Sequence, residues 1–191
     1  MSSWFFGIAP SSAFYLREPS NNAATYDFMG KGLNSIFPEL GIGYYYEPLR
    51  VHSVITSRYV VLNKKAFDVH QRFERLAIGF ESFWYFANYH GFVPYAGLNY
   101  SYEKLRFKET DYLGKKDFTY EGFKPGIVIG WDIMVEKFQH ITLRTNIRYF
   151  PNMGIDIDGS KKVWLDQIEF NFIEFVYYPG RKKKVESVWY E

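Results

Sequence analysis

The sequence predicts an all-β fold, namely an eight-stranded antiparallel up-and-down transmembrane β-barrel. Three observations support this prediction: eight segments alternate apolar and polar residues, aromatic residues make up 21% of the chain, and the connections alternate between short and long. Alternation with period two indicates strands, and tyrosine and tryptophan collect at membrane interfaces. No run approaches the ~20 apolar residues that a membrane-spanning helix needs. A chain of this kind can therefore cross a bilayer only as a closed barrel.

Composition indicates one ordered domain and excludes several kinds of site. The chain has 191 residues, 47% of them hydrophobic, and a formal net charge of +2. That charge is too small to favour nucleic acid as a partner. Because there is no cysteine, the chain has no disulfide, thiolate metal site or cysteine nucleophile. Met1 to Trp4 contain no signal-peptide pattern, so we expect the mature form of an exported protein.

Eight segments have the composition or alternation of strands. They are residues 4–17, 36–47, 51–63, 73–86, 92–107, 120–135, 140–150 and 164–178. Segment 73–86 also fits a helix, because Leu76, Phe80 and Phe83 would share a helical face. Its neighbours favour a strand, since a lone helix would interrupt a series of hairpins.

The connections are sorted by length. Short links are predicted at 48–50, 87–91 and 136–138, and long polar links at 18–35, 64–72, 108–119 and 151–163. If the strands run up and down, every short link falls at one end and every long link at the other. Outer-membrane barrels have this asymmetry, with short periplasmic turns and longer outer loops. A soluble sandwich has no reason to show it.

The two faces of the strands differ in character. In the segment from Phe123 to Ile133, one face carries Phe123, Pro125, Ile127, Ile129, Trp131 and Ile133, and the other carries Lys124, Gly126, Val128, Gly130 and Asp132. A soluble sandwich would bury the apolar face, whereas a membrane barrel turns it toward lipid and keeps the polar face inside. We take the polar face to be the lumen.

This assignment predicts a charge network in the lumen. The charged residues on the polar face are Glu39, Arg58, Arg75, Glu81, Glu103, Lys124, Asp132, Arg144, Arg148 and Glu169. Acids and bases are equal in number in this set, as a narrow lumen would require if each buried charge is to be neutralised. An eight-stranded barrel has an interior that side chains just fill, so a diffusive pore is not expected.

The end of the chain, LDQIEFNFIEFVYYPGRKKK, is read as a closing strand followed by an exit from the membrane. Strict alternation would place Glu174 toward lipid, so it lies at the interface or a bulge near Ile173 turns it inward, and we favour the bulge. The domains are thus a barrel at 1–179 and a basic, aromatic periplasmic tail at 180–191. Candidate lipid or partner contacts in the tail are Arg181, Lys182, Lys183, Lys184, Trp189 and Tyr190.

Four segments resemble small outer-membrane β-barrels of the eight-stranded OmpA and OmpW type, especially the barrel domains common in Bacteroidota. They are PELGIGYYYEP, FVPYAGLNYSYEKLRF, GFKPGIVIGWDI and IEFNFIEFVYY, and the resemblance extends to about Tyr178. It implies a Gram-negative outer-membrane location and an integral barrel. These motifs report architecture and carry no chemistry.

The sequence does not favour an enzyme, a cofactor or a metal. Lipid A deacylases of this barrel type carry a His-x-Ser-Asn element, but here Tyr149 and Pro151 stand at the histidine and serine positions, so the base and the nucleophile are missing. Asp156 to Ser160 suits a solvated turn better than a calcium loop, because the later acidic ligands are lacking. No histidine has a metal-binding spacing.

The function predicted is therefore a non-enzymatic integral outer-membrane barrel with a side-chain-filled charged lumen. It would be a structural or partner-binding component of the cell envelope, within a larger membrane complex. Its partners would be outer-membrane lipid and lipopolysaccharide, and an envelope protein bound through the outer loops or the tail. The alternatives are an outer-membrane enzyme that modifies lipid A or phospholipid, and a soluble lipid-binding barrel.

Overall fold

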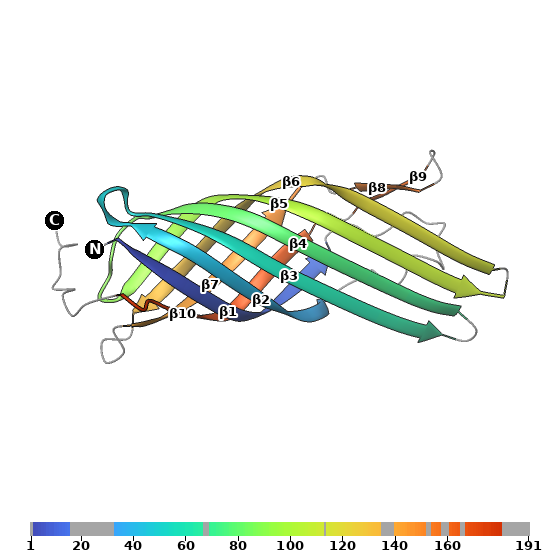
Figure 1. The fold of residues 1–191 in the computed structure, drawn as a ribbon, viewed down its shortest axis with the longest axis horizontal. Helices are drawn as coiled ribbons and strands as arrows, with labels where there is room; N and C mark the ends of the chain where they lie inside the picture. Colours follow the sequence, from blue (N-terminus) through green and yellow to red (C-terminus); the bar gives the residue numbers. More distant parts are fainter. Residues whose placement is uncertain are drawn as a thin grey trace.

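Eight strands close into an antiparallel barrel, as predicted (Figure 1). The computed structural model describes residues 2–15, 33–66, 69–112, 114–134, 140–151, 154–157, 161–164 and 167–180. The barrel strands are β1 (Ser3–Tyr15), β2 (Leu33–Tyr46), β3 (Val51–Ala66), β4 (Val69–Tyr85), β5 (Phe92–Asp111), β6 (Gly114–Met134), β7 (Ile141–Phe150) and β10 (Gln167–Tyr177). β1 pairs with β10 and closes the cylinder. All of segment 73–86 except its last residue, Phe86, lies within β4, which confirms the strand assignment.

Short turns join β2 to β3 and β4 to β5 at the end of the barrel where β1 begins and β10 ends (Figure 1). A single 3-10 turn, Glu47–Leu49, links β2 to β3, and Arg50 closes it in the left-handed region at φ 54°. Between β4 and β5 the chain turns at Gly91, whose φ of 92° suits glycine. The Gly91 N–H donates to Asn88 Oδ1 at 2.7 Å. No helix in the described part of the chain is long and apolar enough to span a membrane.

At the opposite end the predicted loops are largely strand. Residues 64–66 and 69–72 belong to β3 and β4, while β5 continues to Asp111 and β6 begins at Gly114. The segment 151–163 contains part of a separate hairpin, β8 (Gly154–Ile157) paired with β9 (Lys161–Trp164). The expectation of long loops at 64–72 and 108–119 was therefore wrong. The charged side chains on the outward face of these strands contact water, because this part of the barrel lies beyond the bilayer.

An apolar belt surrounds the outside of the barrel. Its exposed side chains include Trp4, Ile8, Leu40, Ile42, Ile55, Ile78, Phe80, Trp84, Leu98, Ile127, Ile129, Ile133 and Phe175. Rings stand at its margins, with Phe92 near the short turns and Tyr100, Tyr102 and Phe123 toward the other end. On β5 the belt extends from Phe92 to Tyr102, which matches the roughly 9–11 residues of a tilted membrane-spanning strand.

β3 to β6 extend well beyond the other barrel strands (Figure 1). β5 has 20 residues and β6 has 21, about twice what a bilayer requires. We call the extension, residues 60–66, 69–76, 103–111 and 114–122, the outer wall. On its outward face Lys104 pairs with Glu121, and Arg106 with Asp117 at 2.6 Å. Its inward face buries Phe73, Leu105 and Phe107.

A β-bulge interrupts β10. Phe172 and Ile173 are both exposed, whereas Asn171 and Glu174 on either side of them are buried. The pairing register shifts at the same place, between Asn171 and Glu174 against β7. The bulge predicted near Ile173 is thus confirmed, and it turns the Glu174 carboxylate into the lumen. On the outside, the Thr145 hydroxyl donates to the Phe172 carbonyl at 2.8 Å.

Candidate functional site: the charged lumen

The interior of the barrel is filled with charged and polar side chains, packed together with buried apolar and aromatic ones. Its largest fully buried side chains include four arginines: Arg58, Arg75, Arg144 and Arg148. Each lies at a position whose two chain neighbours face outward, because successive residues of a strand point to opposite sides. A buried guanidinium needs carboxylate partners to offset the loss of water, and all four have them.

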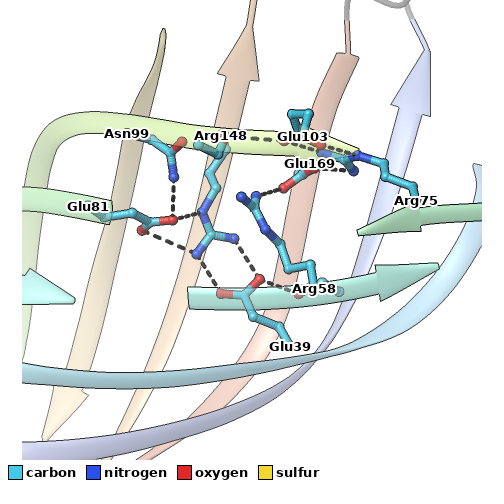
Figure 2. Close-up of polar contacts among 10 residues, drawn as sticks. Glu39, Arg58, Arg75, Glu81, Asn99, Glu103, Arg148 and Glu169 are labelled. Atoms are coloured by element: carbon cyan, nitrogen blue, oxygen red, sulfur yellow. Dashed lines mark hydrogen bonds and ion pairs between the residues drawn. The ribbon is translucent and has the colours of Figure 1, made fainter. Parts of the chain in front are cut away.

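Arg148 on β7 lies between two carboxylates from other strands (Figure 2). Its Nη1 and Nη2 donate to Glu39 on β2 at 2.8 and 2.6 Å, and its Nε donates to Glu81 on β4 at 2.5 Å. Ser11 Oγ donates to Glu39 at 3.0 Å, and Asn99 Nδ2 donates to Glu81 at 2.7 Å. One guanidinium thus ties β2, β4 and β7 together across the lumen.

Nearer the outer wall, two arginines share one glutamate (Figure 2). Glu169 on β10 pairs with Arg58 on β3 and, at 2.5 Å, with Arg75 on β4. Arg75 also donates to both oxygens of Glu103 on β5, at 2.7 and 2.9 Å. Charge-assisted, bidentate bonds of this kind are the strongest that side chains form with one another. At this level too, ion pairs connect strands on different sides of the lumen.

Near the short turns, Arg144 on β7 is the centre of a third group. It donates from Nε to Asp132 at 2.8 Å and from Nη2 to His52 Nδ1 at 3.2 Å, and it lies 3.7 Å from Glu174. Aromatic rings enclose it: the Arg144 guanidinium carbon is 5.0 Å from the Phe83 ring centre. The Tyr85 hydroxyl also donates to Asp132. Rings and ion pairs together fill this end of the barrel.

The structure brings together every residue of the predicted lumen set except Lys124. Lys124 is half-buried at the base of the outer wall, with its ammonium 5.0 Å from the Tyr120 ring centre. It forms no ion pair with a described residue. Glu174 takes part through the bulge instead, so among the residues that the structure describes six buried acids face four buried arginines. The expected equality of acids and bases was therefore wrong.

The predicted lumen network consisted of charged residues, and the lumen also holds other side chains. His52 is buried among rings, 4.9 Å from Phe5 and 4.7 Å from Tyr85 between ring centres. It is the second residue of β3, and it shares the even-numbered face of β3 with Arg58, a spacing that places it inside. Tyr85, Tyr95 and Asn99 are likewise buried on the inward faces of β4 and β5. In the sequence, aromatic and amide residues do not indicate a position in the lumen as clearly as charged residues do.

Other candidate residues lie elsewhere. His70, His90 and His140 are exposed, and the described part of the chain holds no group of His, Asp or Glu suited to a metal ion. Tyr149, at the position of the deacylase histidine, lies on the outward-facing register of β7. The tail contacts Arg181, Lys182, Lys183, Lys184, Trp189 and Tyr190 fall outside the described residues.

The arrangement of faces is the reverse of that in a soluble lipid-binding barrel, which needs an apolar interior. Here the charges are inside and the apolar belt is outside, as a membrane barrel requires. The three arginine groups occupy successive levels of the lumen, so the interior is a packed network and not an apolar cavity.

Comparisons with known proteins agree with this architecture. No protein-family model matches the sequence, and no curated protein matches it. Among solved structures, Neisserial surface protein A (NspA) has a TM-score of 0.62 at 15% identity, covering 92% of this chain and 96% of that one. The outer membrane protein AlkL, solved in lipid bilayers, has a TM-score of 0.52 at 10% identity, covering 96% and 94%.

A third match is Ail, the attachment invasion locus protein of Yersinia pestis. Its TM-score is 0.50 at 12% identity, covering 93% of this chain and 96% of that one. At such low identities these structures are informative about fold alone, and the alignments run over nearly the whole length of each. The chain therefore has the fold of the small eight-stranded outer-membrane β-barrels.

Proposed function

We propose that the chain is an integral, non-enzymatic barrel of a bacterial outer membrane. It serves as a structural or partner-binding component of the cell envelope, within a larger membrane complex. The observation that carries this proposal is the filled lumen, in which Arg58, Arg75, Arg144 and Arg148 are each buried and ion-paired between strands. A lumen of this kind leaves no room for a diffusive pore, so the function is carried by surfaces outside it.

Two surfaces are available for that function. The apolar belt faces outer-membrane lipid, and the charged outward face of the outer wall stands where lipopolysaccharide headgroups lie. An envelope protein would bind at the outer wall, the outer loops or the C-terminal tail. Fold alone does not determine such a role. The support for it is the exposure of the apolar belt and of the outward face of the outer wall, together with the closure of the lumen.

Conductance across a planar lipid bilayer tests the closed lumen. The purified, refolded chain should insert without adding a steady ionic current. A variant with Arg144→Ala and Arg148→Ala, checked for folding by circular dichroism, should conduct, because two levels of the network lose their cation. A steady conductance from the unmodified barrel would contradict the proposal.

Mass spectrometry of the envelope lipids tests the non-enzymatic part. Lipid A and phospholipid should have the same acyl composition in outer membranes with and without the expressed chain. Fractionation in the same experiment should recover the chain with the outer membrane. A new deacylated or acyl-transferred lipid species would contradict the absence of enzymatic activity.

A further inference from the structure

Three buried side chains in the middle of the lumen have polar atoms without a hydrogen-bond partner among the described residues. They are Tyr95 on β5, Asn146 on β7 and Asn171 on β10, which are 1%, 1% and 0% exposed. The atoms are the Tyr95 hydroxyl oxygen, Asn146 Oδ1, and both Oδ1 and Nδ2 of Asn171. Buried polar groups are nearly always hydrogen-bonded, either to protein or to ordered water. Four such atoms on three neighbouring side chains therefore indicate a bound ligand.

The strand register places these side chains next to one another. Asn146 lies directly opposite Asn171 in the β7–β10 ladder, and opposing residues have Cβ atoms about 5 Å apart. On the other side of Asn146 is Gly130, which in turn lies opposite Tyr95. A Cβ at Gly130 would be only 2.6 Å from the Tyr95 hydroxyl oxygen. Because glycine has no side chain, the Tyr95 hydroxyl can reach across β6 toward Asn146.

Ion pairs close the lumen on both sides of this level. Asn146 is the inward-facing residue between Arg144 and Arg148 on β7. Arg148 pairs with Glu39 at 2.6 Å. Arg144 pairs with Asp132 at 2.8 Å, and all four of these charged side chains are buried. The unpartnered polar atoms are therefore enclosed between two levels of the network that described residues form.

The pairing of β10 with its neighbours is irregular at the same level. The register against β7 shifts between Asn171 and Glu174, and the register against β1 shifts between Ile8 and Ser11, the partner of Asn171. Backbone pairing is locally disrupted at a bulge, so contacts other than the ladder must hold the strands there. A ligand between Asn146 and Asn171 would connect β7 to β10 directly beside the bulge.

The chemistry of these side chains selects a small neutral ligand that both donates and accepts hydrogen bonds. The Tyr95 hydroxyl and Asn171 Nδ2 can donate, whereas the Oδ1 atom of each asparagine only accepts. A cation would lie between the guanidinium groups of Arg144 and Arg148. An anion would add negative charge beside the carboxylates that these arginines already neutralise. Water fits, because it donates and accepts two bonds each and typically forms about three when buried.

We propose that Tyr95, Asn146 and Asn171 bind ordered water in the middle of the lumen. One molecule would donate to Oδ1 of each asparagine and accept from the Tyr95 hydroxyl, and it would thereby join β5, β7 and β10. A bridging water of this kind is nearly as favourable as a direct hydrogen bond. The inference goes beyond the proposed function and does not rest on it, because water enclosed between two closed levels provides no path for ions.

High-resolution crystallography of the full chain tests the site directly. A density peak should lie roughly 2.7–3.2 Å from Asn146 Oδ1, from the Asn171 side chain and from the Tyr95 hydroxyl. Direct hydrogen bonds among these three side chains, with no peak between them, would overturn the proposal. A peak about 2.3–2.6 Å from several oxygens would also overturn it, because those are the distances of a hard cation such as calcium.

Oxygen-17 relaxation dispersion in lipid nanodiscs tests the site in solution, because it counts long-lived bound water and does not respond to exchanging hydroxyl protons. The variant combines Asn146→Leu and Asn171→Leu, since leucine has nearly the shape of asparagine and no polar atoms. The number of long-lived waters per barrel should fall by at least one. Asn63→Leu is the matched control, because Asn63 is an exposed amide on β3, and it should leave the number unchanged.

An equal number of long-lived waters in the double leucine variant and the unmodified chain would overturn the proposal. Circular dichroism of the variant shows whether it has folded, and the crystallographic test needs no variant at all. Conductance of the unmodified chain reports separately on the closed lumen. A closed barrel whose Asn146 and Asn171 bind no water would refute this inference and leave the proposed function intact.

Discussion

The single guanidinium of Arg148 neutralises two buried carboxylates, so the lumen depends strongly on this residue. Glu39 and Glu81 approach it from different strands, at 2.6 and 2.5 Å. Buried ion pairs gain little net stability over apolar packing, because both charges lose their water. Removing only the cation is costly, since both anions then remain buried without a partner.

We therefore predict that Arg148→Met lowers the free energy of unfolding by about 3–5 kcal/mol. Urea unfolding in detergent micelles, followed by tryptophan fluorescence, measures the change. Adding Glu39→Gln and Glu81→Gln to Arg148→Met should recover much of the loss. Arg72→Met is the matched surface control, because Arg72 is half-exposed and its ion pair should contribute about 0–1 kcal/mol. Similar losses in both arginine variants would contradict the network.

The outer wall carries an ion pair whose pH dependence is predictable. Hydrogen bonding from Arg106 lowers the pKa of the Asp117 carboxyl below its ordinary value. The folded state therefore binds fewer protons at this group than the unfolded state. Its stabilising effect is present above the unfolded pKa of about 3.9 and is lost as the pH falls through the folded pKa.

Arg106→Gln should consequently raise the pKa of Asp117 toward its ordinary value. Carbon-13 NMR titration of the Asp117 carboxyl in micelles measures this, with Arg72→Gln as the control that leaves Arg106 in place. An unchanged Asp117 pKa in Arg106→Gln would show that the pair does not persist in solution.

At the residue scale, period-two alternation was enough to place most lumen charges. The pattern placed Arg58, Arg144 and Arg148 inside the lumen, where they lie, because the alternation of their strands is not interrupted at those positions. Alternation assigned Lys124 to the correct face, but it could not tell where the closed lumen ends. Glu174 shows the opposite case, because a bulge changes the face of every residue beyond it.

At the scale of the element, the bulge in β10 leaves a carbonyl that Thr145 satisfies. The Thr145 hydroxyl donates to the Phe172 carbonyl at 2.8 Å on the outward face. Lipid provides no substitute donor, so the group would otherwise be unsatisfied. This hydrogen bond from Thr145 explains how two successive residues of β10 can face outward within a membrane.

Thr145→Val should therefore destabilise the barrel by about 1 kcal/mol, the typical value of one hydrogen bond. The midpoint of urea unfolding in lipid vesicles measures the loss, and Thr145→Ser, which keeps the hydroxyl, should retain most of the stability. If valine and serine behave alike, the bulge does not depend on this bond.

Close backbone approach between strands gives a further prediction. A Cβ at Gly97 would lie 2.1 Å from the Ser82 carbonyl oxygen and 2.5 Å from Phe83 Cα, whereas one at Gly180 meets nothing within 4 Å. Gly97→Ala should destabilise by about 1–3 kcal/mol through overpacking, and Gly180→Ala should have little effect. Differential urea unfolding of the two variants checks this, and equal stability would contradict the packing of β4 on β5.

The lengths of β5 and β6 illustrate what sequence reasoning misses at this scale. Residues 108–119 are polar on both faces and therefore resemble a loop. In the structure residues 108–111 and 114–119 are strand, because ion pairs such as Arg106 with Asp117 stabilise the outward face across the two strands. Such pairs join residues distant in sequence, and local composition does not reveal them.

At the scale of the whole molecule, the fold was predictable because the bilayer restricts the choice. A strand-rich chain with one apolar face must either bury that face or turn it to lipid. Charged residues on the other face, such as Glu39 and Arg58, favoured a barrel whose apolar face is turned to lipid. Sequence alone could not show that β6 is about twice as long as β7, its neighbour in the barrel.

The central claim is that the apolar face meets lipid while the charged face is closed inside. Nuclear Overhauser effects from lipid acyl chains to side-chain protons, measured in nanodiscs, test it most directly along β6. We predict strong contacts at Ile127, Ile129 and Ile133 and none at Val128 or Asp132, giving a period of two. Acyl contacts at Val128 and Asp132, or no alternation between the two sets, would contradict the account.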